Sequence, residues 1–210
     1  MNQHETVVVG GEPLSPEGEQ LIEYLRSRAA AMSVRSIYER IRAAANEIEA
    51  LVAGITEEES RRRPVPGKWT IAEVVDHIAQ TQIRACEELR HLLAGRCPPG
   101  PPVYEALRSA APNWAPWQEL VDGLFSANRE IVNLLAVASE GAEPAPATAR
   151  TILVITRKLP DGSTGPQIFI AELNWREYAL VQRLHLLDHR TQIKNLRASG
   201  SGASAASSLG

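Results

Sequence analysis

Apolar residues that recur at alternating steps of three and four constrain the fold of this chain more than any other feature of its sequence. Between residues 34 and 51 they are Val34, Ile37, Ile41, Ala44, Ile48 and Leu51. Such spacing puts one apolar stripe along a helix, as in a helix packed in a bundle. Segments 71–93, 116–138 and 171–196 are also predicted to be helices. The sequence therefore predicts four packed helices.

Local signals mark the boundaries of these helices. Thr70 and Glu73 form a capping box before the second helix, and Pro116 suits the first turn of the third. A long proline-rich connection joins these two helices. Before the last helix, two apolar runs within residues 151–171 flank a turn at Asp161-Gly162, which predicts a β-hairpin. The expected fold class is all-α: a four-helix bundle with crossover connections, a small β-hairpin and an N-terminal extension.

Length and composition fit one core rather than two. The chain has 210 residues, of which 44% are hydrophobic. We assign residues 34–198 to the bundle domain and residues 1–33 to an extended arm with an accessory helix. Residues 199–210, rich in Gly, Ser and Ala, are expected to form a flexible tail.

Charge and cysteine content exclude several classes of function. A net charge of -3 provides no field to attract nucleic acid or an acidic membrane surface. The chain has no signal-like start and no apolar run near the roughly 18 residues of a membrane span. Its two cysteines, Cys86 and Cys97, do not describe a disulfide-stapled secreted domain. We therefore expect an unprocessed cytoplasmic protein that acts on a small molecule.

Two histidines four residues apart are the first candidate for chemistry. His185 and His189 share one face of the last predicted helix with apolar residues. Neutral imidazoles in a core need hydrogen-bond partners, and a bound cation uses both lone pairs at once. A pair of satisfied core histidines is the alternative. Leu186 stands where a zinc-protease helix carries its glutamate, which excludes that class of peptidase.

A third ligand is expected from a facing helix, and His77 is the candidate. It lies on the flank of the second helix, where it either joins the site or faces solvent. Three neutral histidines with an open position hold Zn²⁺ or another late first-row divalent ion. The metal could then lower the pKa of a water or thiol.

Four further residues are candidates for outer hydrogen bonds or substrate orientation. Glu73 has this interpretation beside its capping role, and Asp188 beside polar packing. Gln182 and Tyr178 either orient a substrate or pack in the core. No catalytic residue is identified. A second apolar stripe, formed by Leu173, Leu180, Leu184 and Leu187, requires cover from the hairpin or from a second subunit in a homodimer.

Two segments together show a family resemblance. The run PVPGKWTIAEVVDHIAQTQ resembles the entry to the second helix of the DinB/YfiT-like family, with its W-[ST]-x-x-E-x-x-x-H pattern. The run NWREYALVQRLHLLDHRTQIKNL resembles that family's last helix. The similarity covers residues 34–197. It implies a four-helix bundle whose divalent metal, often nickel or zinc, is bound by His77, His185 and His189. The N-terminal extension and the hairpin depart from the typical pattern.

Two hypotheses follow for function. The resemblance implies a metal-dependent enzyme, since the members that are understood are largely thiol-dependent transferases or isomerases that use low-molecular-weight thiols. Many others are labelled metal-dependent hydrolases. The alternative is a non-catalytic metal-binding or dimerising helical-bundle module. A pocket beside the metal with an exchangeable water favours the enzyme, and a closed site favours the module.

Overall fold

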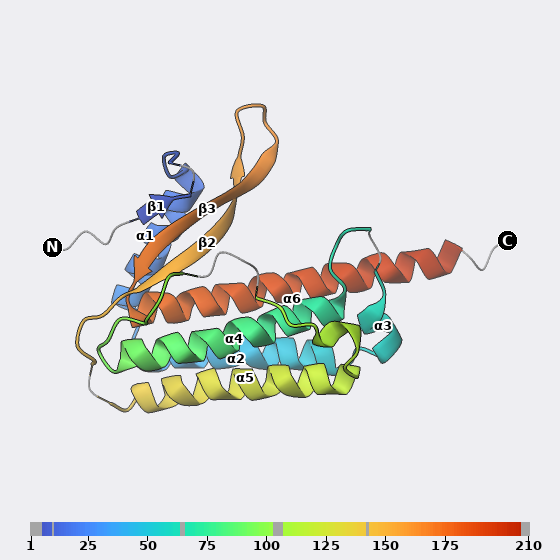
Figure 1. Ribbon diagram of the computed structural model, residues 1–210, viewed down its shortest axis with the longest axis horizontal. Coiled ribbons are helices and arrows are strands. Elements are labelled where there is room, and N and C mark those ends of the chain that lie inside the picture. Colours follow the sequence, from blue (N-terminus) through green and yellow to red (C-terminus); the bar gives the residue numbers. More distant parts are fainter. Residues whose placement is uncertain (1–5, 10, 64–65, 103–106, 142, 207–210) are drawn as a thin grey trace.

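Four long helices form the body of the molecule, as predicted (Figure 1). The computed structural model describes residues 6–9, 11–63, 66–102, 107–141 and 143–206, with 200–206 as backbone only. The bundle consists of α2 (Val34–Ala53), α4 (Ile71–Leu93), α5 (Trp117–Ala138) and α6 (Trp175–Ala206). Both α2 and α4 contact α5 and α6. In cross-section, α2 and α4 therefore lie at the ends of one diagonal of the bundle, and α5 and α6 lie at the ends of the other.

Side-chain caps explain where the bundle helices begin. At the start of α4, Thr70 Oγ1 accepts a hydrogen bond from the Glu73 N–H (3.2 Å), and Glu73 Oε2 accepts one from the Thr70 N–H (2.6 Å). This is the predicted capping box. Pro116 directly precedes the first residue of α5. The Trp117 N–H donates to Glu57 in α3 (Glu57–Arg61), a helix too short to be recognised from periodicity.

The predicted hairpin is present, and a third strand extends it. β2 (Ala149–Lys158) and β3 (Thr164–Leu173) pair antiparallel around a turn in which Gly162 has φ of +82°. β1 (Thr6–Val8), from the predicted extended arm, adds to the other edge of β3. The accessory helix is α1 (Pro16–Ala31), which contacts α6 and β2. The sheet and α1 sit on one end of the bundle (Figure 1).

The bounds of α6 differ from the prediction at both ends. β3 continues to Leu173, so α6 begins at Trp175 rather than near residue 171. At its other end the helix runs to Ala206, through residues 199–206 that composition assigned to the tail. Only two glycines fall in that stretch, and its alanines have the highest helix propensity of any residue.

The second apolar stripe predicted for the last helix is covered within the chain, and its first member, Leu173, is the last residue of β3. Leu173, Leu180 and Leu184 pack into a core cluster that also contains residues of α1 and the sheet. Leu187 packs against the rest of the bundle core. The hairpin, α1 and the bundle core therefore supply the cover, and this stripe no longer argues for a homodimer.

The bundle core consists of two apolar clusters with buried amides between them. Along α4, Gln82 lies between Ala79 in one cluster and Ala85 in the other. Asn128 in α5 and Gln182 in α6 occupy equivalent positions. These amides are 0, 1 and 4% exposed, in the order Gln82, Asn128, Gln182. No described residue accepts or donates a hydrogen bond to either amide atom of Gln82. A polar layer therefore divides the core.

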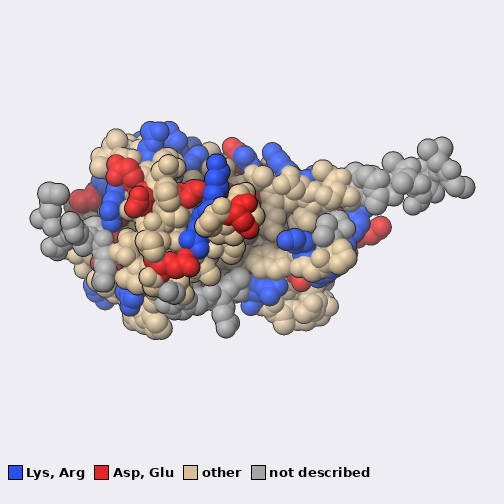
Figure 2. Space-filling view, turned by 90° about the horizontal axis from the view of Figure 1, so that it is seen from above, with Lys and Arg blue, Asp and Glu red and all other residues tan. Residues whose placement is uncertain are grey.

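The surface carries both signs of charge. On the face shown in Figure 2, described Lys and Arg residues are interspersed with Asp and Glu. Among the helices in the described ranges, none combines the length and the apolar character needed to cross a membrane.

Candidate metal centre

The three predicted histidines meet at the interface between α4 and α6. His77 lies in the second turn of α4, and His185 and His189 lie one turn apart in the middle of α6. Nε2 of His185 is 3.0 Å from Nε2 of His77 and 3.0 Å from Nε2 of His189. One ring nitrogen from each residue lies within 4.8 Å of the others. Of the two positions considered for His77, the structure therefore shows the one inside the site.

The outer ring nitrogens of two histidines have fixed partners. His77 Nδ1 lies 2.8 Å from the carbonyl oxygen of Leu107, and His189 Nδ1 lies 2.7 Å from Oε1 of Gln192. Both oxygens are acceptors, so each Nδ1 carries the hydrogen and each Nε2 presents a lone pair. Metal-binding histidines are commonly oriented by such outer contacts.

This tautomer assignment makes the site suitable for a cation. Nε2 of His185 carries at most one hydrogen, so it can donate to either His77 or His189 but not fully to both. At least one pair of nitrogens then faces lone pair to lone pair at 3.0 Å. A single cation accepts all three lone pairs, and imidazole suits nickel and zinc. The residues present therefore fit a divalent metal ion.

Burial keeps all three histidines neutral, as metal ligands must be. Desolvation lowers the pKa of His189 to about 4. It also holds the pKa of His185 well below its usual range, and the neighbouring His189 and His77 add to that effect. The pKa of His77 is lowered by desolvation too, and the charge of Arg108 contributes. At pH 7 protons therefore compete little with a metal ion for the nitrogens of the cluster.

A loop from the long α4–α5 connection is fastened beside the site. Asp76, only 4% exposed, accepts hydrogen bonds from the N–H and hydroxyl of Ser109, both at 2.6 Å. The adjacent His77 holds Leu107 in the same loop. Asp76 was missed by the sequence interpretation, because its partner lies in a loop whose position no periodicity reveals. Gln192 was missed as well, although its spacing of three from His189 could have indicated it.

The four outer candidates lie in different surroundings. Glu73 forms the capping box and an ion pair with Arg63 (3.0 Å). Tyr178 is 3% exposed and hydrogen-bonds to Glu88, and this burial, with the Glu88 charge, raises the pKa of the phenol well above its usual range. Asp188 is exposed on α6. Gln182 is buried one turn before His185, with no described partner for its Oε1.

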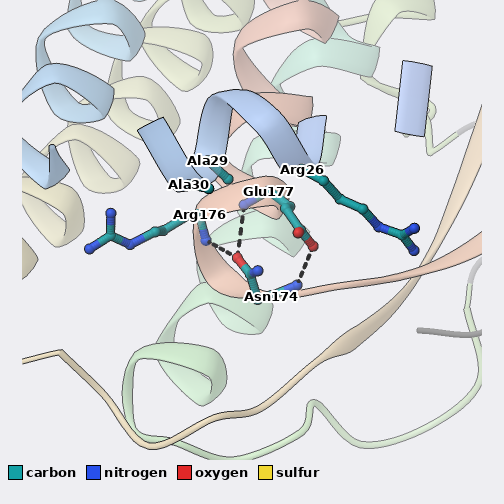
Figure 3. Close-up of a pocket in the computed structure, with 6 residues that line it drawn as sticks. All are labelled: Arg26, Ala29, Ala30, Asn174, Arg176 and Glu177. Atoms are coloured by element: carbon teal, nitrogen blue, oxygen red, sulfur yellow. Dashed lines mark hydrogen bonds between the residues drawn. The ribbon is translucent and has the colours of Figure 1, made fainter. Parts of the chain in front are cut away.

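A hollow at the start of α6 lies outside the histidine site. Figure 3 shows it lined by α1 residues and by Asn174, Arg176 and Glu177. Asn174 Oδ1 accepts hydrogen bonds from the N–H groups of Arg176 and Glu177, and Glu177 Oε2 accepts one from the Asn174 N–H. The side chains of Arg26 and Arg176 point away from each other. These polar groups cap a helix and do not converge on a ligand.

Comparisons with known proteins bear on the family and on the fold. A sequence model described as the DinB superfamily matches residues 40–193. Among solved structures, the chain is similar to YfiT from Bacillus subtilis, described as "a probable metal-dependent hydrolase with an unusual four-helix bundle topology". The two are 12% identical, with a TM-score of 0.50 over 90% of this chain and 91% of that one. No curated protein sequence matches the chain.

Proposed function

Because this chain belongs to the DinB superfamily, we propose that it is a metal-dependent enzyme whose divalent ion is held by His77, His185 and His189. The observation that carries this proposal is the convergence of three neutral imidazole nitrogens at one point. Nickel and zinc are the proposed metals, since both accept imidazole ligands. A low-molecular-weight thiol or water is the proposed nucleophile, and the reaction is S-transfer or hydrolysis of a small molecule.

Neighbouring residues orient the histidine rings so that their nitrogens can bind a metal ion. Leu107 and Gln192 fix the hydrogen on Nδ1 of His77 and His189, so that both Nε2 lone pairs point inward. When bound, a divalent ion would act as a Lewis acid and lower the pKa of the thiol or water. His185 and His189 are only partly buried, and the proposed enzyme requires an open ligand position on the ion.

Elemental analysis of the purified protein by plasma mass spectrometry tests the proposal. We expect near-stoichiometric nickel or zinc in the wild type and its loss in His185→Ala. His91→Ala removes a histidine near the end of α4, outside the cluster, and should retain the metal. A wild-type protein that holds no metal even in excess nickel and zinc contradicts the proposed function.

A further inference from the structure

Arg108 occupies a fixed position beside the histidine cluster. Its neighbour Leu107 accepts a hydrogen bond from His77, and its other neighbour Ser109 donates two to Asp76. The backbone of Arg108 is thus fastened to α4 on both sides, although its side chain is exposed. An exposed side chain on a fastened loop can contact a ligand without first ordering the backbone.

The guanidinium of Arg108 lies over the ring of Trp69, which lies beside His77. Its central carbon lies 4.9 Å from the ring centre of Trp69, and that ring lies 5.1 Å from the ring of His77. The three groups therefore lie one after another, with the rings of Trp69 and His77 tilted by 59°, and the row ends at a proposed metal ligand. Stacking on an aromatic face leaves the N–H edge of a guanidinium available for hydrogen bonds. Among the described residues, no carboxylate forms an ion pair with Arg108.

Without a compensating anion, the positive charge of Arg108 is unfavourable beside a metal site. A dication on the histidines is repelled by Arg108, and the same charge helps to lower the pKa of His77. Two acidic residues of α4, next to His77 and one turn before it, have other partners, since Asp76 binds Ser109 and Glu73 binds Thr70 and Arg63. An anion that spans the ion and Arg108 would compensate both charges.

We propose that Arg108 recognises an anionic group, such as a carboxylate, on the small molecule whose other end reaches the three histidines. This inference rests on the proposed function and adds a substrate class to it: the thiol or its reaction partner is an anion. The guanidinium fork receives a carboxylate through two parallel hydrogen bonds. Arg108 is thus a specificity residue at the edge of the site.

Binding of two simple thiols to the nickel-loaded protein tests this inference. The probes are 3-mercaptopropionate and 3-mercapto-1-propanol, which differ in the carboxylate, and the readout is the thiolate-to-nickel charge-transfer absorption. We expect the wild type to bind the carboxylate thiol at least about tenfold more tightly. Arg108→Gln should remove the part of this preference that the guanidinium supplies, and Arg108→Lys should restore some of it. Arg40→Gln, an exposed arginine on α2, is the control with the same charge change.

Nickel affinity separates recognition from a structural role of the loop. If Arg108 only held Leu107 in place, Arg108→Gln would weaken nickel binding, which contradicts the inference. We expect nickel to bind at least as tightly in that variant, because a nearby cation has been removed. A preference that survives unchanged in Arg108→Gln comes from chelation and also overturns the inference. No absorption with either thiol overturns the inference, whereas a protein that binds neither nickel nor zinc overturns the proposed function itself.

Discussion

His77 and His185 approach each other across the α4–α6 interface with 3.0 Å between their Nε2 atoms. Neither imidazole can take up a proton there without placing a positive charge beside the other residues of the cluster. The pKa of each is accordingly below its usual range, through burial first. This relationship ties the stability of the fold to pH.

We expect the metal-free protein to lose stability as the pH falls below about 6.5, the ordinary pKa of histidine. The unfolded chain then binds protons that the folded cluster excludes, so the free energy of unfolding decreases. The decrease should continue at least to pH 4, near the pKa of His189. Each histidine contributes a slope of up to about 1.4 kcal/mol per pH unit. Urea unfolding between pH 4 and 8 measures it. His185→Gln should flatten the profile and His91→Gln should not.

Asp76 should affect metal binding without contacting the metal. Replacement by Ala leaves the Ser109 N–H and hydroxyl without their acceptor and frees the loop that carries Leu107. We expect a loss of about 1–3 kcal/mol in the free energy of unfolding. Metal affinity should fall about 10-fold or more, as is typical for outer partners of metal ligands. Ser109→Ala removes only the hydroxyl bond and should have the smaller effect in both measurements. Equal metal affinity in wild type and Asp76→Ala would show that the loop does not orient His77.

Gln192 should set the strength of His189 as a ligand. Gln192→Leu removes the acceptor at 2.7 Å from Nδ1, and we expect metal affinity to fall about 10-fold. Gln192→Glu keeps an acceptor at that position and gives it a negative charge, which should raise metal affinity above that of the wild type. Competition with a chelator of known affinity orders the three proteins. If both variants bound the metal as tightly as the wild type, Gln192 would not act on His189.

The buried amide of Gln82 should lower the free energy of unfolding. Its side chain is 0% exposed, and neither amide atom has a described partner. Gln82→Met keeps the length of the side chain and removes the polar atoms, so we expect the free energy of unfolding to rise by about 1 kcal/mol. Gln80→Met, at a half-buried position on the same helix, serves as the control and should change it by less than about 0.5 kcal/mol. A lower stability of Gln82→Met would show that bound water satisfies the amide.

The four bundle helices could be predicted because each carries its own local signal. The capping box at Thr70 and the apolar spacing after it fix α4, whose observed bounds match the expected ones. The same logic placed His185 and His189 on one face. α3 was missed because five residues hold too little periodicity, and β1 because its strand partner is far away in the chain.

The surroundings of the site depend on tertiary structure, and the sequence pattern of a single helix does not predict how helices and loops pack together. His77 lies on the flank of α4, and whether a flank faces solvent or a neighbour depends on how α6 is rotated. The hydrogen bonds of Leu107 and Ser109 depend on the path of a connection without repeating pattern. Arg108 inherits its place from those bonds, so its stacking on Trp69 could not be inferred from sequence.

The pairing of β1 with β3 also sets an order of assembly during synthesis. Val8 is the register partner of Phe169, about 160 residues later in the chain, and both are buried. A ribosome adding roughly 5–20 residues per second makes the first strand on the order of ten seconds or more before its partner exists. The intervening α2, α4 and α5 pack through contacts closer in sequence, which generally form sooner. We therefore expect the strand made first to be among the last to dock.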